Sequence, residues 1–480
     1  MMKSLTVIRT AWLVVLTTLL YACGGGTKVA DGQIGGSGIT SAGSITAFGS
    51  VIVNGVKFDT ATTSVTINGT SQPNDSGLRV GMVVKIKGYL NTDKSTGKAT
   101  TIDYESELVG TVDAAPTITP GGGSFSVFGQ VVLVNATTVF DNATDLATSI
   151  RSGTIVEVSG FRDNTGQVRA TRIEVKNTLP MTSEVRGTIS SVTPTTFVLG
   201  NITVNYANAM RKGFPAAGLT DGLFVEVKAA ALPAGGTLVA ASVEVTSPGI
   251  GAGEHEEAML EGLISNFSGG TAFSVNGQAV SIGGTTIYEN GSAANLANDV
   301  RVEIEGSING GALVAKKVKF GSNSNVSLKA DATSVSVTGS TLTVFGVPGI
   351  TVKMNSTTIY IDKSNANIRT FSLSNIVQGD HLSIKGSKDG NNSIVASLIE
   401  RSNPDTKVSL NGPVDSAISP TIVVLGVNTA TSTTTQFIDA NKNPVSQTAF
   451  FSQLTAGKAV ELEGTFNGTT INVTDASLED

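Results

Sequence analysis

The chain has 480 residues, with 32 Lys and Arg against 38 Asp and Glu, and a formal net charge of −6. It contains 55 glycines but a single cysteine and a single tryptophan, and aromatic residues make up only 5%. This acidic, aromatic-poor composition excludes nucleic acid as a partner, and one cysteine excludes internal disulfides and multi-thiolate metal sites. The abundance of Gly, Thr, Val, Ser and Asn favours β-strands over long helices.

Residues 1–22 have the pattern of an export signal. Lys3 and Arg9 give a positively charged start, and residues 11–20 form an apolar run. That run is too short to cross a bilayer as a helix and is typical of a secretory signal peptide. We therefore predict that residues 1–22 are a signal peptide. Its removal leaves 30 basic against 38 acidic residues, a net charge of about −8.

The segment Leu20-Tyr21-Ala22-Cys23-Gly24 resembles the lipobox of bacterial lipoproteins. In that family the cysteine becomes the acylated N-terminus, so the resemblance implies lipid attachment at Cys23. Such a use of the sulfur explains why the chain has one cysteine, and several acyl chains give stable anchoring. Glycine after the cysteine implies the outer membrane of the bacterial cell envelope, with the periplasmic and surface faces both left open. Residues 23–36 are then a lipidated, glycine-rich flexible tether.

Beyond the tether, the motif L-x-x-G-x-x-V-x-V-x-G occurs six times. The first copy consists of Leu78, Gly81, Val84, Ile86 and Gly88. The last motif position is occupied by Gly88, Gly160, Ala229, Gly306, Gly386 and Gly464. These positions are 69 to 80 residues apart, which is too long for a solenoid repeat and indicates small domains in series.

Each repeat has the same internal order of predicted elements. Three short strands precede a variable stretch, and the V-x-V-x-G strand then leads into a hairpin that returns through a fifth strand. In the last repeat, Ala449, Phe450 and Leu454 have helical spacing within the variable stretch. Five strands with a short helical segment between the third and fourth match the order of an OB-like barrel. A β-sandwich fits less well, because about 70 residues supply only five strands.

The two motif glycines have distinct roles in this interpretation. The first is expected to turn the chain with positive φ before the fourth strand, and the second to let that strand coil sharply around a small barrel. In the fourth copy Asp299 stands at the first glycine position. The fold class predicted is therefore all-β, with six tandem OB-like five-stranded barrels after a lipoprotein signal peptide.

Polar or glycine-rich segments separate most of the repeats. The β-barrel repeats are predicted at residues 37–107, 108–178, 183–247, 256–320, 326–401 and 406–480. Only the junction at residues 107–110 has no such linker, so repeats 1 and 2 are expected to pack against each other.

V-x-V-x-G followed by A-x-x-I, as in residues 156–160 and 170–173, is similar to the pattern of bacterial lipoproteins built from tandem copies of a small β-barrel domain of unknown function. The resemblance covers essentially the whole mature chain. It implies export and a small barrel, and it brings no catalytic residue.

Candidate chemistry is sparse. Glu254-His255-Glu256-Glu257 is superficially similar to a zinc helix, but Met259 stands where the second histidine would be. The other histidine, His381, is expected to be a strand residue facing solvent. Asp439, Asn441 and Asn443 alternate as at the start of a calcium loop, but Pro444 replaces the required glycine, which favours a polar hairpin. We expect no catalytic, metal-binding or cofactor-binding residue.

The function expected is that of a non-enzymatic, lipid-anchored envelope protein, acting as a multidomain spacer, adhesion protein or partner-binding scaffold. Its partner would be an envelope protein or a glycan, and the chain would be an elongated monomer. The alternative is a lipoprotein that binds a polysaccharide or a small ligand through one or two diverged repeats. Repeat 3 has the most unusual insert, at residues 211–215.

Overall fold

The structure is a computed structural model that describes residues 38–478, apart from 49, 120–121, 179–182, 248, 322–325, 347–348, 356, 391 and 442. The predicted signal peptide, the tether and the lipid site Cys23 lie outside the described residues. Residues 37–480 form one compact unit. None of the helices described is long and apolar enough to span a membrane.

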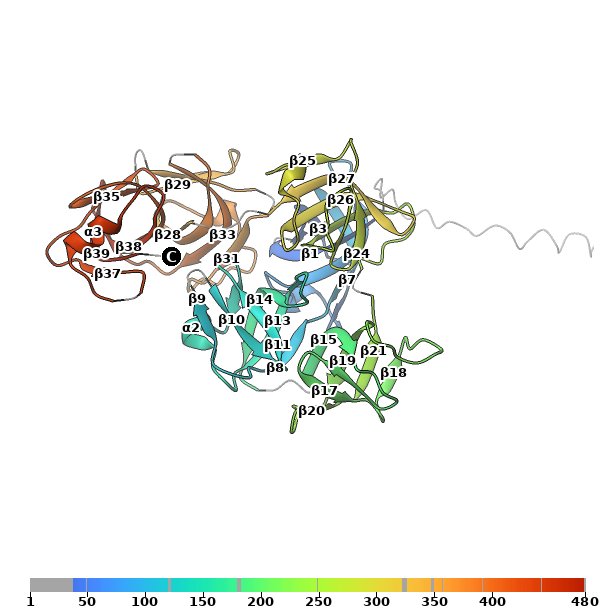
Figure 1. Cartoon of the computed structure of the whole chain (residues 1–480). Coiled ribbons are helices and arrows are strands. Elements are labelled where there is room, and N and C mark those ends of the chain that lie inside the picture. The colour runs from blue at the N-terminus through green and yellow to red at the C-terminus, as the bar shows by residue number, and fades with distance from the viewer. Residues whose placement is uncertain are drawn as a thin grey trace, which may run out of the picture. The chain divides into compact units, whose positions relative to one another are not determined.

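The first three repeats consist of short strands with little helix (Figure 1). Repeat 1 contains β1 (Gly38–Ala47), β2 (Val51–Val53), β3 (Val56–Asp59), β4 (Ser64–Ile67), β5 (Thr70–Gln72), the 3-10 helix η1 (Asp75–Gly77), β6 (Val83–Leu90) and β7 (Thr96–Tyr104). Repeat 2 contains β8 (Leu108–Thr111), β9 (Thr117–Thr119), β10 (Gly122–Val127), β11 (Gln130–Val134), β12 (Val139–Asp141), α2 (Leu146–Ser149), β13 (Ile155–Arg162) and β14 (Val168–Lys176). Repeat 3 contains β15 (Ser183–Ser190), β16 (Thr196–Leu199), β17 (Ile202–Asn205), β18 (Met210–Lys212), β19 (Phe224–Ala229), β20 (Thr237–Val239) and β21 (Ser242–Val245).

The last three repeats follow the same order. Repeat 4 contains β22 (Glu257–Ser265), β23 (Ala272–Val275), β24 (Gln278–Ser281), β25 (Ile287–Glu289), η2 (Ala293–Asn295), β26 (Arg301–Asn309) and β27 (Ala312–Phe320). Repeat 5 contains β28 (Val326–Ser336), β29 (Thr341–Val344), β30 (Ile350–Lys353), β31 (Ile359–Asp362), η3 (Leu373–Asn375), β32 (His381–Lys388) and β33 (Ser393–Ser402). Repeat 6 contains β34 (Lys407–Ile418), β35 (Thr421–Val424), β36 (Val427–Ala430), β37 (Gln436–Ile438), α3 (Gln447–Gln453), β38 (Ala459–Phe466) and β39 (Ile471–Leu478).

Strand pairing closes repeat 1 into a five-stranded ring. β1 pairs antiparallel with β2, β2 with β3, and β6 with both β7 and β1, while β3 pairs parallel with β7. This order, with one parallel pair between the third and fifth main strands, is that of an OB-like barrel. Repeat 6 closes in the same way through β34, β35, β36, β39 and β38. The predicted all-β, OB-like fold is confirmed.

The first motif glycine has the conformation expected of it. Its φ is positive in every copy that retains it: Gly81 (84°), Gly153 (82°), Gly222 (90°), Gly379 (91°) and Gly457 (88°). Asp299 also has positive φ, at 69°, so the turn survives without glycine. The backbone therefore makes the same turn before the fourth main strand in all six repeats.

The second motif glycine is needed because another backbone approaches it closely. At Gly160 the register between β13 and β14 shifts, and a Cβ there would overlap the carbonyl oxygen of Arg169. The corresponding overlap at Gly464 would be with the carbonyl of Asn472. In repeat 3 Ala229 occupies this position, β19 ends there, and the returning strand is divided into β20 and β21. In the one repeat with alanine at this position, the returning strand is therefore interrupted.

The first strand of a repeat also joins that repeat to another one. One edge of β1 pairs with β6, and its other edge pairs with β2 only from Ile45 onward. The earlier residues 39–42 overhang β2 and pair in parallel with β22 of repeat 4. An unpaired strand edge is a liability, and this one is covered by another repeat.

The same use of the first strand joins the other repeats in pairs. β8 of repeat 2 pairs antiparallel with β15 of repeat 3, and β28 of repeat 5 pairs antiparallel with β34 of repeat 6. Repeats 2 and 3 share one hydrophobic cluster, as do repeats 5 and 6. Repeats 1 and 4 keep separate clusters but exchange side chains, since Met259 packs in the core of repeat 1 and Ala42 against that of repeat 4. The small domains in series indicated by the motif spacing therefore do not each enclose a separate interior.

Candidate functional site

A cavity of about 710 Å³ is lined by side chains of repeats 1 to 4. Part of its lining is one row of residues across four neighbouring strands, β22, β1, β6 and β7. In this row Leu260 is the register partner of Ala42, Ala42 of Lys85, and Lys85 of Asp103. Register partners on adjacent strands lie on the same face of a sheet. The shared sheet of repeats 1 and 4 thus presents a charged pair to the cavity.

Lys85 and Asp103 face each other but do not form an ion pair. In the part of the chain that the structure describes, neither side chain has a hydrogen bond or an opposite charge within 4 Å. The two charges still interact over a longer distance. Burial lowers the pKa of Lys85, and the nearby Asp103 carboxylate partly offsets that effect. Both charges are partly buried and incompletely compensated.

A network around two arginines, Arg162 and Arg186, also lines the cavity. Arg162 donates from Nε to Glu107 Oε2 at 2.9 Å and from Nη1 to Gln130 Oε1 at 2.8 Å. Arg186 Nη1 lies 3.7 Å from Glu107 Oε1. Both guanidinium groups lie over the ring of Phe224, at 5.7 and 5.8 Å from its centroid. These cations are therefore held in place by Glu107, Gln130 and the ring of Phe224.

A hairpin tip of repeat 2 contacts repeat 4 at the edge of the cavity. The backbone N–H of Asn164 donates to Asp299 Oδ1 at 2.7 Å, and Asn164 Oδ1 accepts from the backbone N–H of Asn266 at 2.9 Å. Asp299 is the residue that replaces the first motif glycine in repeat 4. Its carboxylate thus supplies a contact between repeats that glycine could not make.

A cluster of glutamates surrounds Lys228 where repeats 1 and 3 meet. Lys228 Nζ lies 3.2 Å from Glu226, 3.4 Å from Glu184 and 3.7 Å from Glu105. Burial, reinforced by the charge of Glu226, raises the pKa of Glu105 to about 7. Lys228, together with Arg186 at 3.6 Å from Glu226, faces three carboxylates, and Glu105, which also lines the cavity, is the one whose pKa is raised most.

We expect Glu105→Gln to raise the melting temperature at pH 8 and to leave it nearly unchanged at pH 4. A carboxyl group whose pKa is raised by folding destabilises the folded state once it ionises. The penalty is absent below the unfolded pKa of about 4.5, grows through pH 7 and is complete above it. Calorimetry from pH 4 to 8 measures this, with Glu244→Gln, an exposed carboxylate, as the control. Equal melting temperatures at pH 8 would contradict the assignment.

A hydrogen-bonded group of Glu261, Ser44 and Arg301 joins repeats 1 and 4 beside the cavity. The buried Glu261 accepts from the backbone N–H of Ser44 at 2.7 Å and from its hydroxyl at 2.8 Å. Arg301 donates from Nε to Glu261 at 2.8 Å and lies over Phe161 of repeat 2, 5.4 Å from the ring centroid. Three repeats therefore meet at this arginine.

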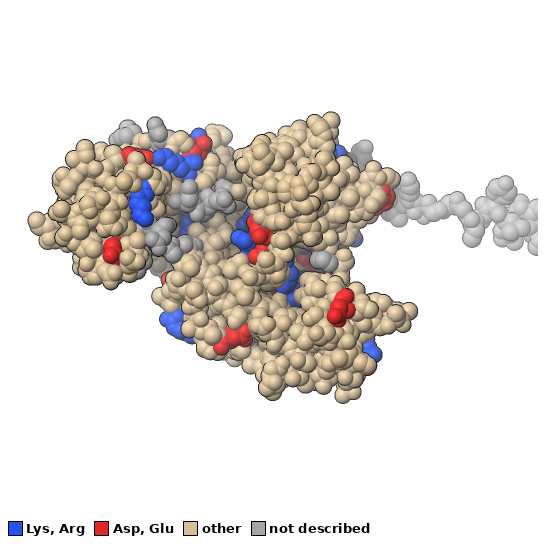
Figure 2. All heavy atoms as spheres, in the orientation of Figure 1, with Lys and Arg blue, Asp and Glu red and all other residues tan. Residues whose placement is uncertain are grey.

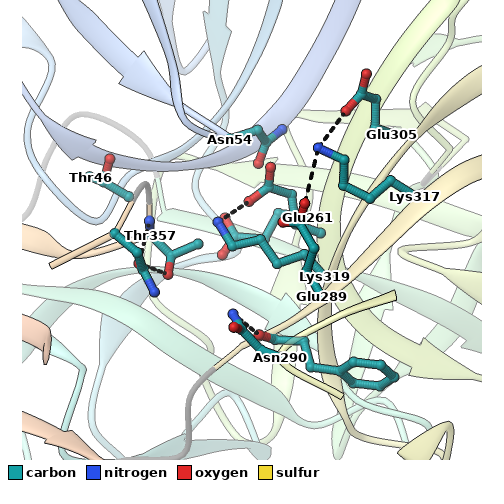
Figure 3. Close-up of polar contacts among 12 residues, drawn as sticks. Thr46, Asn54, Glu261, Glu289, Asn290, Glu305, Lys317, Lys319 and Thr357 are labelled. Atoms are coloured by element: carbon teal, nitrogen blue, oxygen red, sulfur yellow. Dashed lines mark hydrogen bonds and ion pairs between the residues drawn. The ribbon is translucent and has the colours of Figure 1, made fainter. Parts of the chain in front are cut away.

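The outer strands of repeat 4 carry a ladder of ion pairs near Glu261. Lys317 lies between Glu305 and Glu289, at 3.2 and 3.5 Å (Figure 3). Such partly exposed pairs contribute little to stability. On the face of the molecule that Figure 2 shows, charged side chains are few and scattered. No single-sign patch on this face offers an alternative site.

The residues considered from the sequence do not gather at the cavity. His255 is exposed in a turn, and Glu254 accepts from the backbone N–H of Gly310 at 2.7 Å. Asp439 accepts from the backbone N–H of Asn443 at 2.8 Å, as a polar hairpin requires. No group of three or more His, Cys, Asp or Glu among the described residues could hold a metal ion.

The prediction that His381 faces solvent is wrong. Its side chain is only 4% exposed, and its Nδ1 lies 2.7 Å from Asp331 Oδ1. His381 begins β32, and its register partners are Asp331 on β28 and Ser402 on β33. β28 and β33 therefore flank His381 on both sides. The alternation of apolar and polar residues along β32 alone does not reveal this burial.

The cavity residues Lys85, Asp103, Glu105 and Arg186 were not singled out from the sequence. Lys85 stands at a polar position of the V-x-V-x-G strand, and the same position holds Glu157 in repeat 2 and Glu303 in repeat 4. A change of charge at this outward-facing position is the one signal that could have marked it.

Together, the ring order, the two motif glycines and the six-fold repetition define a protein built from small OB-like barrels. The chain belongs to the family described as Domain of unknown function (DUF5666). The family profile matches residues 39–103, 109–174, 186–244, 261–319, 333–400 and 411–474. A search of curated proteins gave no match.

Proposed function

We propose that this protein is a non-enzymatic, lipid-anchored scaffold of the bacterial cell envelope, in which paired barrels act together to hold a partner. The observation that carries the proposal is the shared first strand. In each pair it pairs with a strand of its own repeat and also forms a sheet with another repeat. Strand pairing and a shared core fix the repeats of a pair relative to each other, which suits a binding framework.

Anchoring rests on Cys23, the single cysteine, which follows the predicted signal peptide. Cys23→Ser should abolish incorporation of a palmitate analogue during growth and should release the exported protein from the membrane fraction. The matched control is Ser37→Cys in the Cys23→Ser background, which restores a thiol away from the lipobox and should restore neither property. A Cys23→Ser protein that still carries lipid would contradict the anchor.

Exposed apolar side chains provide positions at which to test the scaffold role. Ile418 is 81% exposed at the turn between β34 and β35, and Val239 and Ile287 are also exposed. A photoreactive residue placed at each position in cells should cross-link the protein to an envelope protein or glycan at one or more of them. The same protein irradiated after purification is the control. Cross-links confined to the protein itself at all three positions would argue against a scaffold.

The cavity favours a second function, binding of a small ligand. Its volume is within the range of about 300–1,000 Å³ typical of small-molecule sites. Four repeats line it, in contrast to the one or two diverged repeats considered from the sequence. The unusual insert of repeat 3 lies elsewhere, where Arg211 stacks over Tyr206 and Phe214 at 5.3 and 5.7 Å.

A further inference from the structure

We propose that the cavity among repeats 1 to 4 binds a small zwitterion, namely a short peptide or an amino acid with free termini. Its acidic group would lie against Lys85 and its ammonium group against Asp103 and Glu105. This inference rests on the ligand-binding role proposed for the cavity and adds the chemistry of the ligand.

The strongest support is the separated charge pair on the cavity lining. Lys85 and Asp103 are register partners on β6 and β7, both line the cavity, and no ion pair within 4 Å joins them. Partly buried charges of opposite sign are stabilised when counter-charges approach them. A zwitterion supplies one counter-charge to each, whereas a ligand of a single sign would leave one of them uncompensated.

Unsatisfied polar atoms of both kinds lie on other lining residues. Arg186 Nε, Glu105 Oε2 and Asn276 Oδ1 are buried and form no hydrogen bond within the described part of the chain. Arg186 Nε and Glu105 Oε2 have only longer ionic contacts, of 3.6 Å to Glu226 and 3.7 Å to Lys228. A buried donor or acceptor without a hydrogen bond is costly, so the polar network behind the cavity wall is incompletely satisfied.

The aromatic rings of the cavity do not favour a stacked ligand. Arg301 lies over Phe161, and Arg162 and Arg186 lie over Phe224. Because guanidinium groups occupy these rings, the stacking platform that bases require is already covered. A multiply charged anion is also disfavoured, since the lining has four carboxylates, of Asp103, Glu105, Glu107 and Asp163, against three cations.

The test uses the full chain and an equimolar mixture of Ala-Xaa-Ala tripeptides, observed by saturation-transfer NMR. We expect signal from tripeptides with free termini. Affinity should fall about tenfold or more after acetylation of the amine or amidation of the carboxylate, because each removes one charge-assisted contact. Lys85→Met and Asp103→Asn should cause similar losses. Lys87→Met, an exposed lysine two residues away on the same strand, should bind as the unchanged protein does.

The outcomes separate the ligand class from the ligand-binding role. Free tripeptides that give no signal with the folded protein overturn the zwitterion inference. Maltotriose that binds the same protein and loses affinity in Lys85→Met also overturns the inference while retaining a small-ligand site. Tripeptide binding that survives both Lys85→Met and Asp103→Asn places the peptide elsewhere and likewise overturns it. Circular dichroism of each variant ensures that a loss does not come from unfolding.

Discussion

Replacing Gly160 with valine should destabilise repeats 2 and 3 together by about 3 kcal/mol or more, while repeats 5 and 6 keep their structure. Any Cβ at Gly160 overlaps the carbonyl oxygen of Arg169 on β14, and the side chain of Val168 also lies near. The strand cannot move away easily, because β13 also pairs with β8 along its other edge. The valine side chain would therefore overlap the backbone of β14, and β13 cannot shift to relieve the overlap.

Both repeats are affected because they share one sheet and one core. Val158 and Val185, on β13 and β15, belong to the same hydrophobic cluster. Hydrogen exchange read by mass spectrometry measures the loss of protection in each repeat. Gly153→Ala is the control, because a Cβ there meets no atom and only the positive φ is strained, at a cost of about 1 kcal/mol. Repeat 3 retaining full protection in Gly160→Val would contradict the shared core.

The second large effect is expected from Arg301→Met, which should destabilise repeats 1 and 4 by about 3 kcal/mol. The substitution leaves the Glu261 carboxylate buried, with Ser44 as its remaining partner. Removing one member of a buried ion pair costs much more than the pair contributes. Methionine keeps much of the side-chain volume, so the loss reports mainly on charge.

Chemical denaturation followed by hydrogen exchange measures this effect, with particular attention to β1 and β22. Lys316→Met is the control, because Lys316 forms a more exposed pair with Glu257 at 3.6 Å, and such pairs contribute about 0–1 kcal/mol. Arg301→Met within 0.5 kcal/mol of the control, roughly the size of ordinary surface changes, would refute the role given to Glu261.

The barrel itself could be predicted from the sequence because its signals are local. A glycine that turns the chain and a second glycine that admits a close backbone approach recur at fixed spacing, as at Gly81 and Gly88. The second glycine also admits a close backbone approach, since Gly88 lies against the carbonyl of Lys98 at a register shift, where a strand bends more sharply. The helix in the last repeat was found because Phe450 and Leu454 repeat at helical spacing.

The pairing of repeats could not be predicted in the same way. Residues 39–42 have no motif that distinguishes a strand paired with β22 from one facing solvent. The linkers suggested separate domains, yet strand overhang and exchanged residues such as Met259 join repeats that are distant in sequence. Repeats 1 and 2 were expected to be in contact, and Tyr104 does donate to the buried Glu157 at 2.9 Å.

The cavity was beyond sequence reasoning for a related reason. Its charged residues come from different repeats, and each alone is an ordinary polar residue on the outer face of a barrel. Lys85 and Asp103 become neighbours only through strand register, and Arg186 joins them only through the pairing of β15 with β8. Charged residues of different repeats come together here only because distant strands pair. No regular spacing in the sequence indicates such pairing.

The central claim, that first strands join distant repeats, is tested most directly by hydrogen exchange of the full chain at increasing denaturant. Repeats 1 and 4 are separated in sequence by two whole repeats, so direct coupling between them comes from the β1–β22 sheet and the side chains that cross it. We predict that the amides of β1 and β22 lose protection in one step, at the same denaturant concentration. Loss of protection in β1 while β22 remains fully protected would contradict the account.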